Sequence, residues 1–75
     1  MQKTKTREGW RFYQDGTLLT VFKNSSDEYE YTVYNATSIN DPEPVEIDGG
    51  IYGDYANEYE LAFDVLDEYK DHKLY

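Results

Sequence analysis

The first half of the chain alternates apolar and polar positions in the way that β-strands do. Residues 9–13 and 17–23 are rich in aromatic and β-branched side chains, which favour strands. Between them, Asp15-Gly16 is a strong signal for a two-residue hairpin, because a type I′ turn needs positive φ at both central residues. Residues 28–35 alternate with the same period after the polar loop 24–27. The pattern predicts a three-stranded antiparallel β-meander.

The segments that flank this meander are less regular. Residues 1–8 carry no apolar side chain beyond Met1, so we expect a flexible tail. Asp41-Pro42-Glu43-Pro44 cannot be helical and should form a rigid, extended segment. Residues 45–47 are an alternative fourth strand, a short one at the edge of the sheet, which Asp48-Gly49-Gly50 would end.

From Asp54 onward, the spacing of the apolar residues changes to the 3.6-residue period of an amphipathic helix. Asp54 and Asn57 are alternative N-caps, and Glu58 and Glu60 suit the positive end of the helix dipole. The apolar face that this spacing predicts consists of Tyr55, Tyr59, Ala62, Phe63, Leu66 and Tyr69. A meander followed by one C-terminal amphipathic helix gives a two-layer α+β fold, and we expect residues 1–75 to form a single domain.

The helix can cover only one face of this sheet, and the expected register assigns each strand residue to a face. One face carries Tyr13, Leu18, Phe22, Tyr29, Tyr31 and Val33. The other carries Trp10, Phe12, Leu19 and Val21, together with the polar Glu30 and Thr32. We expect the first to be the core face, which would leave an aromatic surface around Trp10 and Phe12 partly exposed.

Composition narrows the class of protein. The 75 residues include no cysteine, so the chain has neither a disulfide framework nor a thiolate metal site. Aromatic residues make up 17% of the chain, and their bulk favours a folded domain over the disorder that its charge would otherwise suggest. Residues 1–7 are basic without a following apolar run, and no stretch reaches the ~18–20 apolar residues of a membrane span. We therefore expect a cytoplasmic protein with no secretory signal and no contact with a membrane.

Side chains suited to catalysis are scarce. The one histidine, His72, lies close to the end of the sequence, where a Ser-His-Asp arrangement would lack an ordered imidazole. The carboxylates lie on polar faces, whereas a catalytic pair needs one member to be desolvated. No glycine-rich phosphate loop, zinc-protease motif or complete calcium loop occurs. We expect a protein that is not an enzyme and that has no cofactor and no metal site.

Charge is distributed unevenly along the chain. Sixteen carboxylates against seven lysines and arginines give a net charge of −9, which disfavours direct binding of nucleic acid. Residues 1–25 carry +3, from five cations and two carboxylates, whereas residues 26–75 carry −12, from fourteen carboxylates and two lysines. Five of these carboxylates form a row on the predicted helix, on the side opposite Phe63 and Leu66. This acidic row consists of Glu60, Asp64, Asp67, Glu68 and Asp71.

The acidic row has two interpretations. Like charges three or four positions apart cost a few tenths of a kcal/mol per pair, and no lysine or arginine between residues 54 and 69 relieves them. A cost retained in this way favours a functional surface, while the alternative is a solvated face on an acidic protein. Carboxylates ~5–6 Å apart would also be comparable in spacing to the phosphates of a nucleic-acid strand. Further acids would extend this acidic surface if the loop folds beside the helix. They are Asp54, Glu28, Glu30, Asp41, Glu43, Glu46 and Asp48.

In its small size, lack of cysteine, acidic charge and short meander followed by an acidic helix, the chain resembles phage-encoded DNA-mimic inhibitors. Anti-CRISPR proteins, antirestriction proteins and uracil-DNA glycosylase inhibitors belong to this class. The resemblance covers composition and charge layout and includes no residue motif. It implies a partner with a basic nucleic-acid-binding groove, such as a nuclease or another DNA-processing enzyme, from which the protein excludes DNA. The alternative is a non-enzymatic interaction module or small homodimer that uses the aromatic face with Trp10, Phe12 and Leu19.

Overall fold

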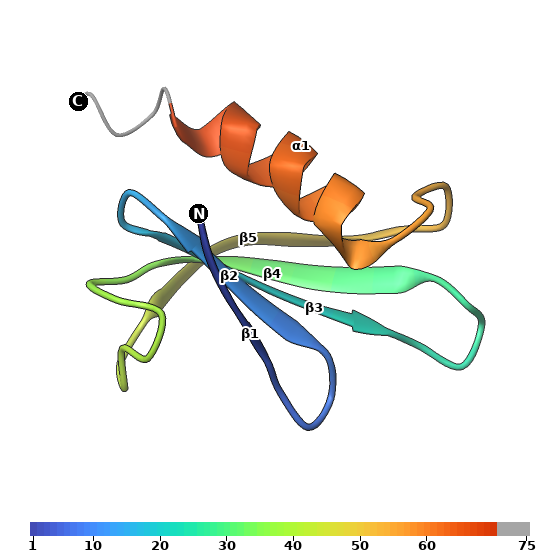
Figure 1. Ribbon diagram of the computed structural model, residues 1–75, viewed down its shortest axis with the longest axis horizontal. Coiled ribbons are helices and arrows are strands. Elements are labelled where there is room, and N and C mark those ends of the chain that lie inside the picture. The colour runs from blue at the N-terminus through green and yellow to red at the C-terminus, as the bar shows by residue number, and fades with distance from the viewer. Residues whose placement is uncertain (71–75) are drawn as a thin grey trace.

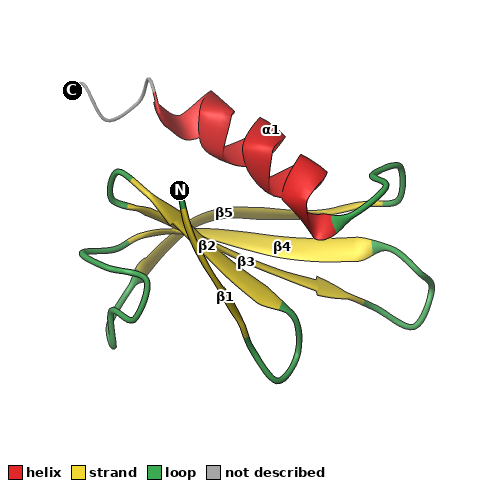
Figure 2. Ribbon diagram, viewed as in Figure 1, coloured by secondary structure: helices red, strands yellow, loops and turns green. Residues whose placement is uncertain are grey.

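A five-stranded antiparallel sheet and one helix make up the fold in the computed structural model, which describes residues 1–70. The strands follow one another across the sheet in chain order, and the helix crosses one of its two faces (Figure 1, Figure 2). The elements are β1 (Gln2–Lys5), β2 (Trp10–Gln14), β3 (Thr17–Lys23), β4 (Tyr29–Asn35), β5 (Val45–Tyr52) and α1 (Glu58–Lys70). Within the described part of the chain, no helix has the length and apolar character that a membrane crossing requires.

The structure confirms the α+β class and the hairpin at Asp15-Gly16. Gln14 pairs with Thr17 across a turn in which φ is 49° at Asp15 and 84° at Gly16. Both values lie in the left-handed region that a type I′ turn needs. The turn fixes the register of β2 on β3.

The sheet has five strands where the sequence predicts three, and β1 is the first addition. The flexible tail predicted for residues 1–8 is wrong for Gln2–Lys5, because these residues pair with β2. Their long polar side chains find partners in aromatic rings on the helix side of the sheet. The Nζ atom of Lys3 lies 4.6 Å from the centre of the Tyr59 ring, and that of Lys5 lies 5.2 Å from the centre of the Trp10 ring. An edge strand can therefore form without an alternating apolar pattern.

The second addition is β5, which is longer than the short strand considered for residues 45–47. It continues through Asp48-Gly49-Gly50, where the sequence predicts its end. The absence of a side chain at Gly50 leaves room for Tyr31 on the neighbouring strand, since a Cβ atom there would lie 2.9 Å from the Tyr31 hydroxyl oxygen. Glycine in a strand commonly marks such a close approach. A register shift at Val33/Tyr34 further distinguishes β5 from a regular strand.

The core face combines residues from both predicted faces: its β2 and β3 residues come from the face predicted to be exposed, whereas Tyr29, Tyr31 and Val33 of β4 lie on it as predicted. Phe12, Leu19 and Val33 lie in one cross-strand row, and each is 0% exposed beneath α1. The predicted four-residue loop pairs Phe22 with Tyr29, but the structure pairs Phe22 with Glu30, so five residues separate β3 from β4. A shift of one residue exchanges the two faces of a strand. The alternative prediction, a dimer surface on the aromatic face, is therefore wrong, because that face forms part of the core.

The side of the sheet that faces away from α1 is called the outer face here. It carries Arg11, Tyr13, Leu18, Thr20, Phe22, Glu30, Thr32 and Tyr34.

Asn57 is the N-cap of α1, which resolves the choice between Asn57 and Asp54. Its side-chain oxygen accepts a hydrogen bond of 3.0 Å from the Glu60 amide. The buried helix residues are Leu61, Ala62, Val65 and Leu66, with Tyr55, Tyr59 and Tyr69 packed at the margins. Phe63, predicted for the apolar face, is 61% exposed. The buried face is thus rotated away from Phe63, because Leu61 and Val65 fill the space over β2 and β3.

Candidate functional site

The described part of the acidic row lies on the exposed side of α1. Glu60, Asp64, Asp67 and Glu68 are all exposed, and the buried residues of the helix lie between them in sequence. Among residues 1–69, no lysine or arginine nitrogen lies within 4.0 Å of Glu60, Asp64 or Glu68. Asp71, the last member predicted, lies outside the described residues.

Two members of the row also serve the helix itself. The Glu60 carboxylate accepts a hydrogen bond of 3.3 Å from the Ala56 amide, next to the Asn57 cap. Asp64 shares a hydrogen bond with Tyr55, on the loop that precedes the helix. These contacts hold the Glu60 and Asp64 carboxylates in place. Glu68 contributes an exposed charge to the row.

The other predicted acids are dispersed. Asp54 is exposed in the loop between β5 and α1, before the cap. Glu30 lies on the outer face of β4, where its carboxylate accepts a hydrogen bond of 3.0 Å from the Asn24 side chain. It therefore does not join the acidic row. The loop with Asp41 and Glu43 folds toward the outer face, because it borders a hollow there with Arg11 and Tyr34.

One loop acid, Asp48, does lie on the helix side. The Tyr69 hydroxyl donates a hydrogen bond to its carboxylate, which ties the last turn of α1 to the edge strand β5. That hydrogen bond is the main cause of a lowered Asp48 pKa, and the Gly49 amide adds to it. The sequence predicts no such contact, because it depends on β5 continuing past the two glycines.

A group of tyrosines separates the helix from β5. The Tyr31 and Tyr52 rings are stacked, with centres 5.4 Å apart and planes 2° apart, and the Tyr55 ring meets Tyr52 edge-on at 5.5 Å. We call Tyr31, Tyr52, Tyr55 and Tyr69 the tyrosine cluster. Asp48, Asp64 and Glu68 act on it electrostatically. The candidate site therefore combines exposed carboxylates with aromatic rings, and Phe63 adds a further exposed ring.

The tyrosine hydroxyls are held in their neutral form. Burial raises the pKa of Tyr31 to about 12, aided by its hydrogen bond with Tyr52. Burial also raises the pKa of Tyr69 and of Tyr55, and hydrogen bonds to Asp48 and Asp64, respectively, add to the effect. A tyrosinate beside these carboxylates would add like charge to like charge.

These shifts predict a loss of stability at alkaline pH. The folded protein holds the protons of Tyr31, Tyr55 and Tyr69 more tightly than an unfolded chain does, so their contribution is fully present below about pH 10. We expect the free energy of unfolding to fall as the pH rises from about 10 toward 12. Urea titrations followed by circular dichroism at stepped pH test this, and Tyr31→Phe should make the fall smaller. A folded protein whose tyrosines all titrate near their ordinary pKa would contradict the prediction.

Comparisons with known proteins add no family assignment. No family model, curated protein or solved structure matches the chain. Within the described residues, no group of three or more histidine, aspartate or glutamate side chains is placed to hold a metal ion. A function for this protein must therefore be inferred from its own surface.

Proposed function

We propose that the protein is a small acidic inhibitor that binds the basic nucleic-acid-binding groove of a host defence or DNA-processing enzyme. Its carboxylates would take the places of DNA phosphates, so that DNA could no longer bind. The observation that carries the proposal is the exposed acidic row, in which Glu60, Asp64 and Glu68 have no lysine or arginine nitrogen of residues 1–69 within 4.0 Å. The protein would act by occupying a site, without catalysis.

The geometry of a helix suits such a role. At ~1.5 Å of rise per residue, Glu60 and Glu68 are separated by roughly 12 Å along the axis. Neighbouring carboxylates on one side of a helix are ~5–6 Å apart, which is comparable to the spacing of successive phosphates. Since Glu60 and Asp64 are held by hydrogen bonds to the preceding loop, part of the row is ordered before a partner arrives.

The surroundings of the row supply apolar contact area. Phe63 is 61% exposed on the same helix, and Tyr52 in the tyrosine cluster is 42% exposed. Aromatic side chains commonly carry much of the binding energy at protein interfaces. In this proposal the charges attract and orient the partner, and the rings supply the close contact.

Such an interaction would be fast and sensitive to salt. A protein with a net charge of −9 is drawn to a basic groove over distances of about one Debye length, which shrinks as salt is added. The proposed setting is the cytoplasm of a host cell, as the resemblance to phage-encoded inhibitors suggests.

A pull-down with competition by DNA tests the proposal. The protein is immobilised and incubated with bacterial lysate at low and at high salt, with and without added duplex DNA. We expect it to capture a nucleic-acid-binding protein at low salt, and we expect DNA or high salt to release that protein. The captured protein, once purified, should lose its DNA complex in a gel-shift assay when about one equivalent of inhibitor is added. Captured proteins that DNA does not displace would contradict the proposal.

A further inference from the structure

A row of small residues runs across the strands on the outer face of the sheet. Thr20 lies opposite Arg11 on one side and Thr32 on the other, and Thr32 lies opposite Gly49. The adjacent rows carry larger side chains: Leu18 and Tyr34 on one side, and Phe22, Glu30 and Ile51 on the other. A row of threonines and a glycine between two rows of large residues forms a shallow groove that leads to Arg11.

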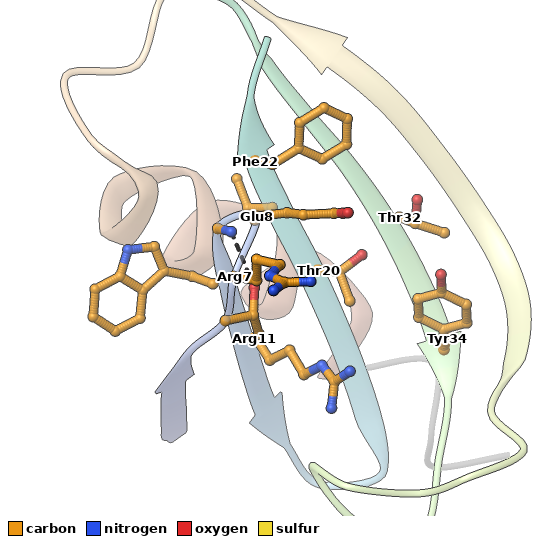
Figure 3. Close-up of a pocket in the computed structure, with 11 residues that line it drawn as sticks. Arg7, Glu8, Arg11, Thr20, Phe22, Thr32 and Tyr34 are labelled. Carbon is orange, nitrogen blue, oxygen red and sulfur yellow. Dashed lines mark hydrogen bonds between the residues drawn. The ribbon is translucent and has the colours of Figure 1, made fainter.

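The groove opens into a hollow on the described surface. Its volume is about 550 Å³, within the range typical of small-ligand sites. Thr6, Arg7, Glu8 and Gly9 of the β1–β2 turn form one wall, and strands β2, β3 and β4 form the floor. Figure 3 shows the side chains of Arg7, Glu8 and Arg11 reaching over the same part of the sheet as Thr20.

Both arginines of the chain line this hollow, and this is unusual for a protein with sixteen carboxylates. Among the described residues, neither Arg7 nor Arg11 has a carboxylate oxygen within 4.0 Å. The turn that carries Arg7 is fixed by a hydrogen bond of 2.8 Å from the Thr6 amide to the Gly9 carbonyl oxygen. A Cβ atom at Gly9 would lie 2.0 Å from the Val21 carbonyl oxygen, so the turn can sit tightly on β3 only with glycine there.

The types of side chain around the hollow indicate the ligand. Guanidinium groups bind phosphate oxygens in pairs of hydrogen bonds, which the ammonium group of lysine does not match. The hydroxyl groups of Thr20 and Thr32 can donate further hydrogen bonds to the same anion. Phe22 and Tyr34 stand at the margins and offer flat rings, and the Glu8 carboxylate can accept hydrogen bonds from amino groups.

We propose that the outer face is a binding site for a small phosphate ester that carries a flat ring with an amino group, which is the chemistry of an adenosine or cytidine monophosphate. Arg7 and Arg11 hold the phosphate, Phe22 or Tyr34 contacts the ring, and Glu8 accepts from its amino group. A long nucleic acid is a poorer candidate, because its further phosphates would meet the negative charge of the remaining protein. The site lies on the side of the sheet opposite α1, so it is independent of the proposed inhibitor function.

Titration of the whole protein with adenosine 5′-monophosphate tests this proposal. Binding is followed by amide chemical shifts in two-dimensional NMR. We expect shifts that saturate and concentrate on Arg11, Thr20, Thr32 and Gly49. Adenosine and inorganic phosphate, used as separate probes, should each bind at least about tenfold more weakly than the ester, since each offers only half of the contacts.

Substitutions of the arginines give the second part of the test. Arg7→Gln and Arg11→Gln should each weaken binding of the ester by about tenfold or more. Lys23→Gln changes the charge equally but lies outside the hollow, and it should leave binding unchanged. The amide spectrum of each variant shows whether it is folded. The proposal would be overturned if about 10 mM ester gave no saturable shift. It would also be overturned if both folded arginine variants bound the ester as tightly as the wild-type protein does, or if inorganic phosphate bound as tightly as the ester.

Discussion

We expect the triple variant Asp64→Lys, Asp67→Lys and Glu68→Lys to bind the proposed partner at least about 100-fold more weakly than the wild-type protein does. Each substitution replaces attraction to a basic groove with repulsion, and like charges brought together at an interface cost several kcal/mol. A 100-fold loss corresponds to roughly 2.7 kcal/mol of binding free energy. The affinity for the captured nucleic-acid-binding protein, measured by calorimetry at fixed salt, checks this expectation.

The same variant should fold with a stability close to that of the wild-type protein. The substitution at position 64 turns repulsion from Glu60 into attraction worth a few tenths of a kcal/mol, while positions 64, 67 and 68 keep like charges and the hydrogen bond of Asp64 with Tyr55 is lost. Lysine is also a better helix former than aspartate and suits the C-terminal half of a helix. Far-UV circular dichroism and urea unfolding test whether binding is lost without loss of structure.

A matched control separates the acidic row from net charge. Glu28→Lys, Glu43→Lys and Glu46→Lys change the total charge by the same amount at positions off the helix. We expect this control to retain most of the affinity and to lose mainly association rate. If the control weakens binding as much as the row variant, or if the row variant still binds, the acidic row is not the interface.

The second large effect is expected for the core, where Phe12→Ala should destabilise the protein by about 3–5 kcal/mol. Phe12 is 0% exposed, and its ring meets Trp10 and Tyr59 at 6.2 and 5.6 Å between centres. A domain of this size has on the order of 5 kcal/mol in total, so the variant should be partly or wholly unfolded at room temperature. Thermal and urea unfolding measure the loss.

Phe63→Ala is the matched control for that change. The same side chain is removed, but Phe63 is 61% exposed, so the free energy of unfolding should change by no more than about 0.5 kcal/mol. In the proposed complex, by contrast, Phe63→Ala should weaken binding. A stability loss at position 63 similar to that at position 12 would mean that the helix packs on the sheet by another face.

Local signals in the sequence sufficed for the parts of the fold that depend on neighbouring residues. Asp15-Gly16 determines its turn through the backbone freedom of those two residues, and the structure has that turn. The helix also follows from its own period, although its buried face does not. The chain offers more large apolar residues than one face can bury, and contact with β2 and β3 decides that Leu61 and Val65 are buried and Phe63 is exposed.

The errors arise where the pairing of strands depends on the conformation of one loop or on residues of another strand. The loop between β3 and β4 has one more residue than expected, because the Asn24 side chain accepts hydrogen bonds from the Ser26 and Glu28 amides while Asp27 adopts a φ of 61°. That single residue puts Val33 on the same side of the sheet as Leu19, where the predicted register places them on opposite sides. In the same way, β1 forms because β2 offers it an edge, and β5 continues because Gly50 accommodates Tyr31.

The candidate site shows the same division. The acidic row follows from spacing along one helix, and four of its five members lie on the exposed side of α1 in the described residues. Glu30 was expected on this surface but lies on the outer face, since its position depends on strand register. Asp48 and the tyrosine cluster could not be placed beside the helix without knowing the course of β5.

The order of the elements along the chain has a consequence for how the protein folds during its synthesis. Every strand pairs with its immediate neighbour in sequence, so hairpins can form one after another with short loop closures, and this favours rapid folding. The helix that covers Phe12 and Leu19 is made after all five strands. Until α1 docks, the nascent sheet has an uncovered apolar face. The arrival of the helix, rather than the pairing of strands, therefore determines how long the growing chain is open to aggregation.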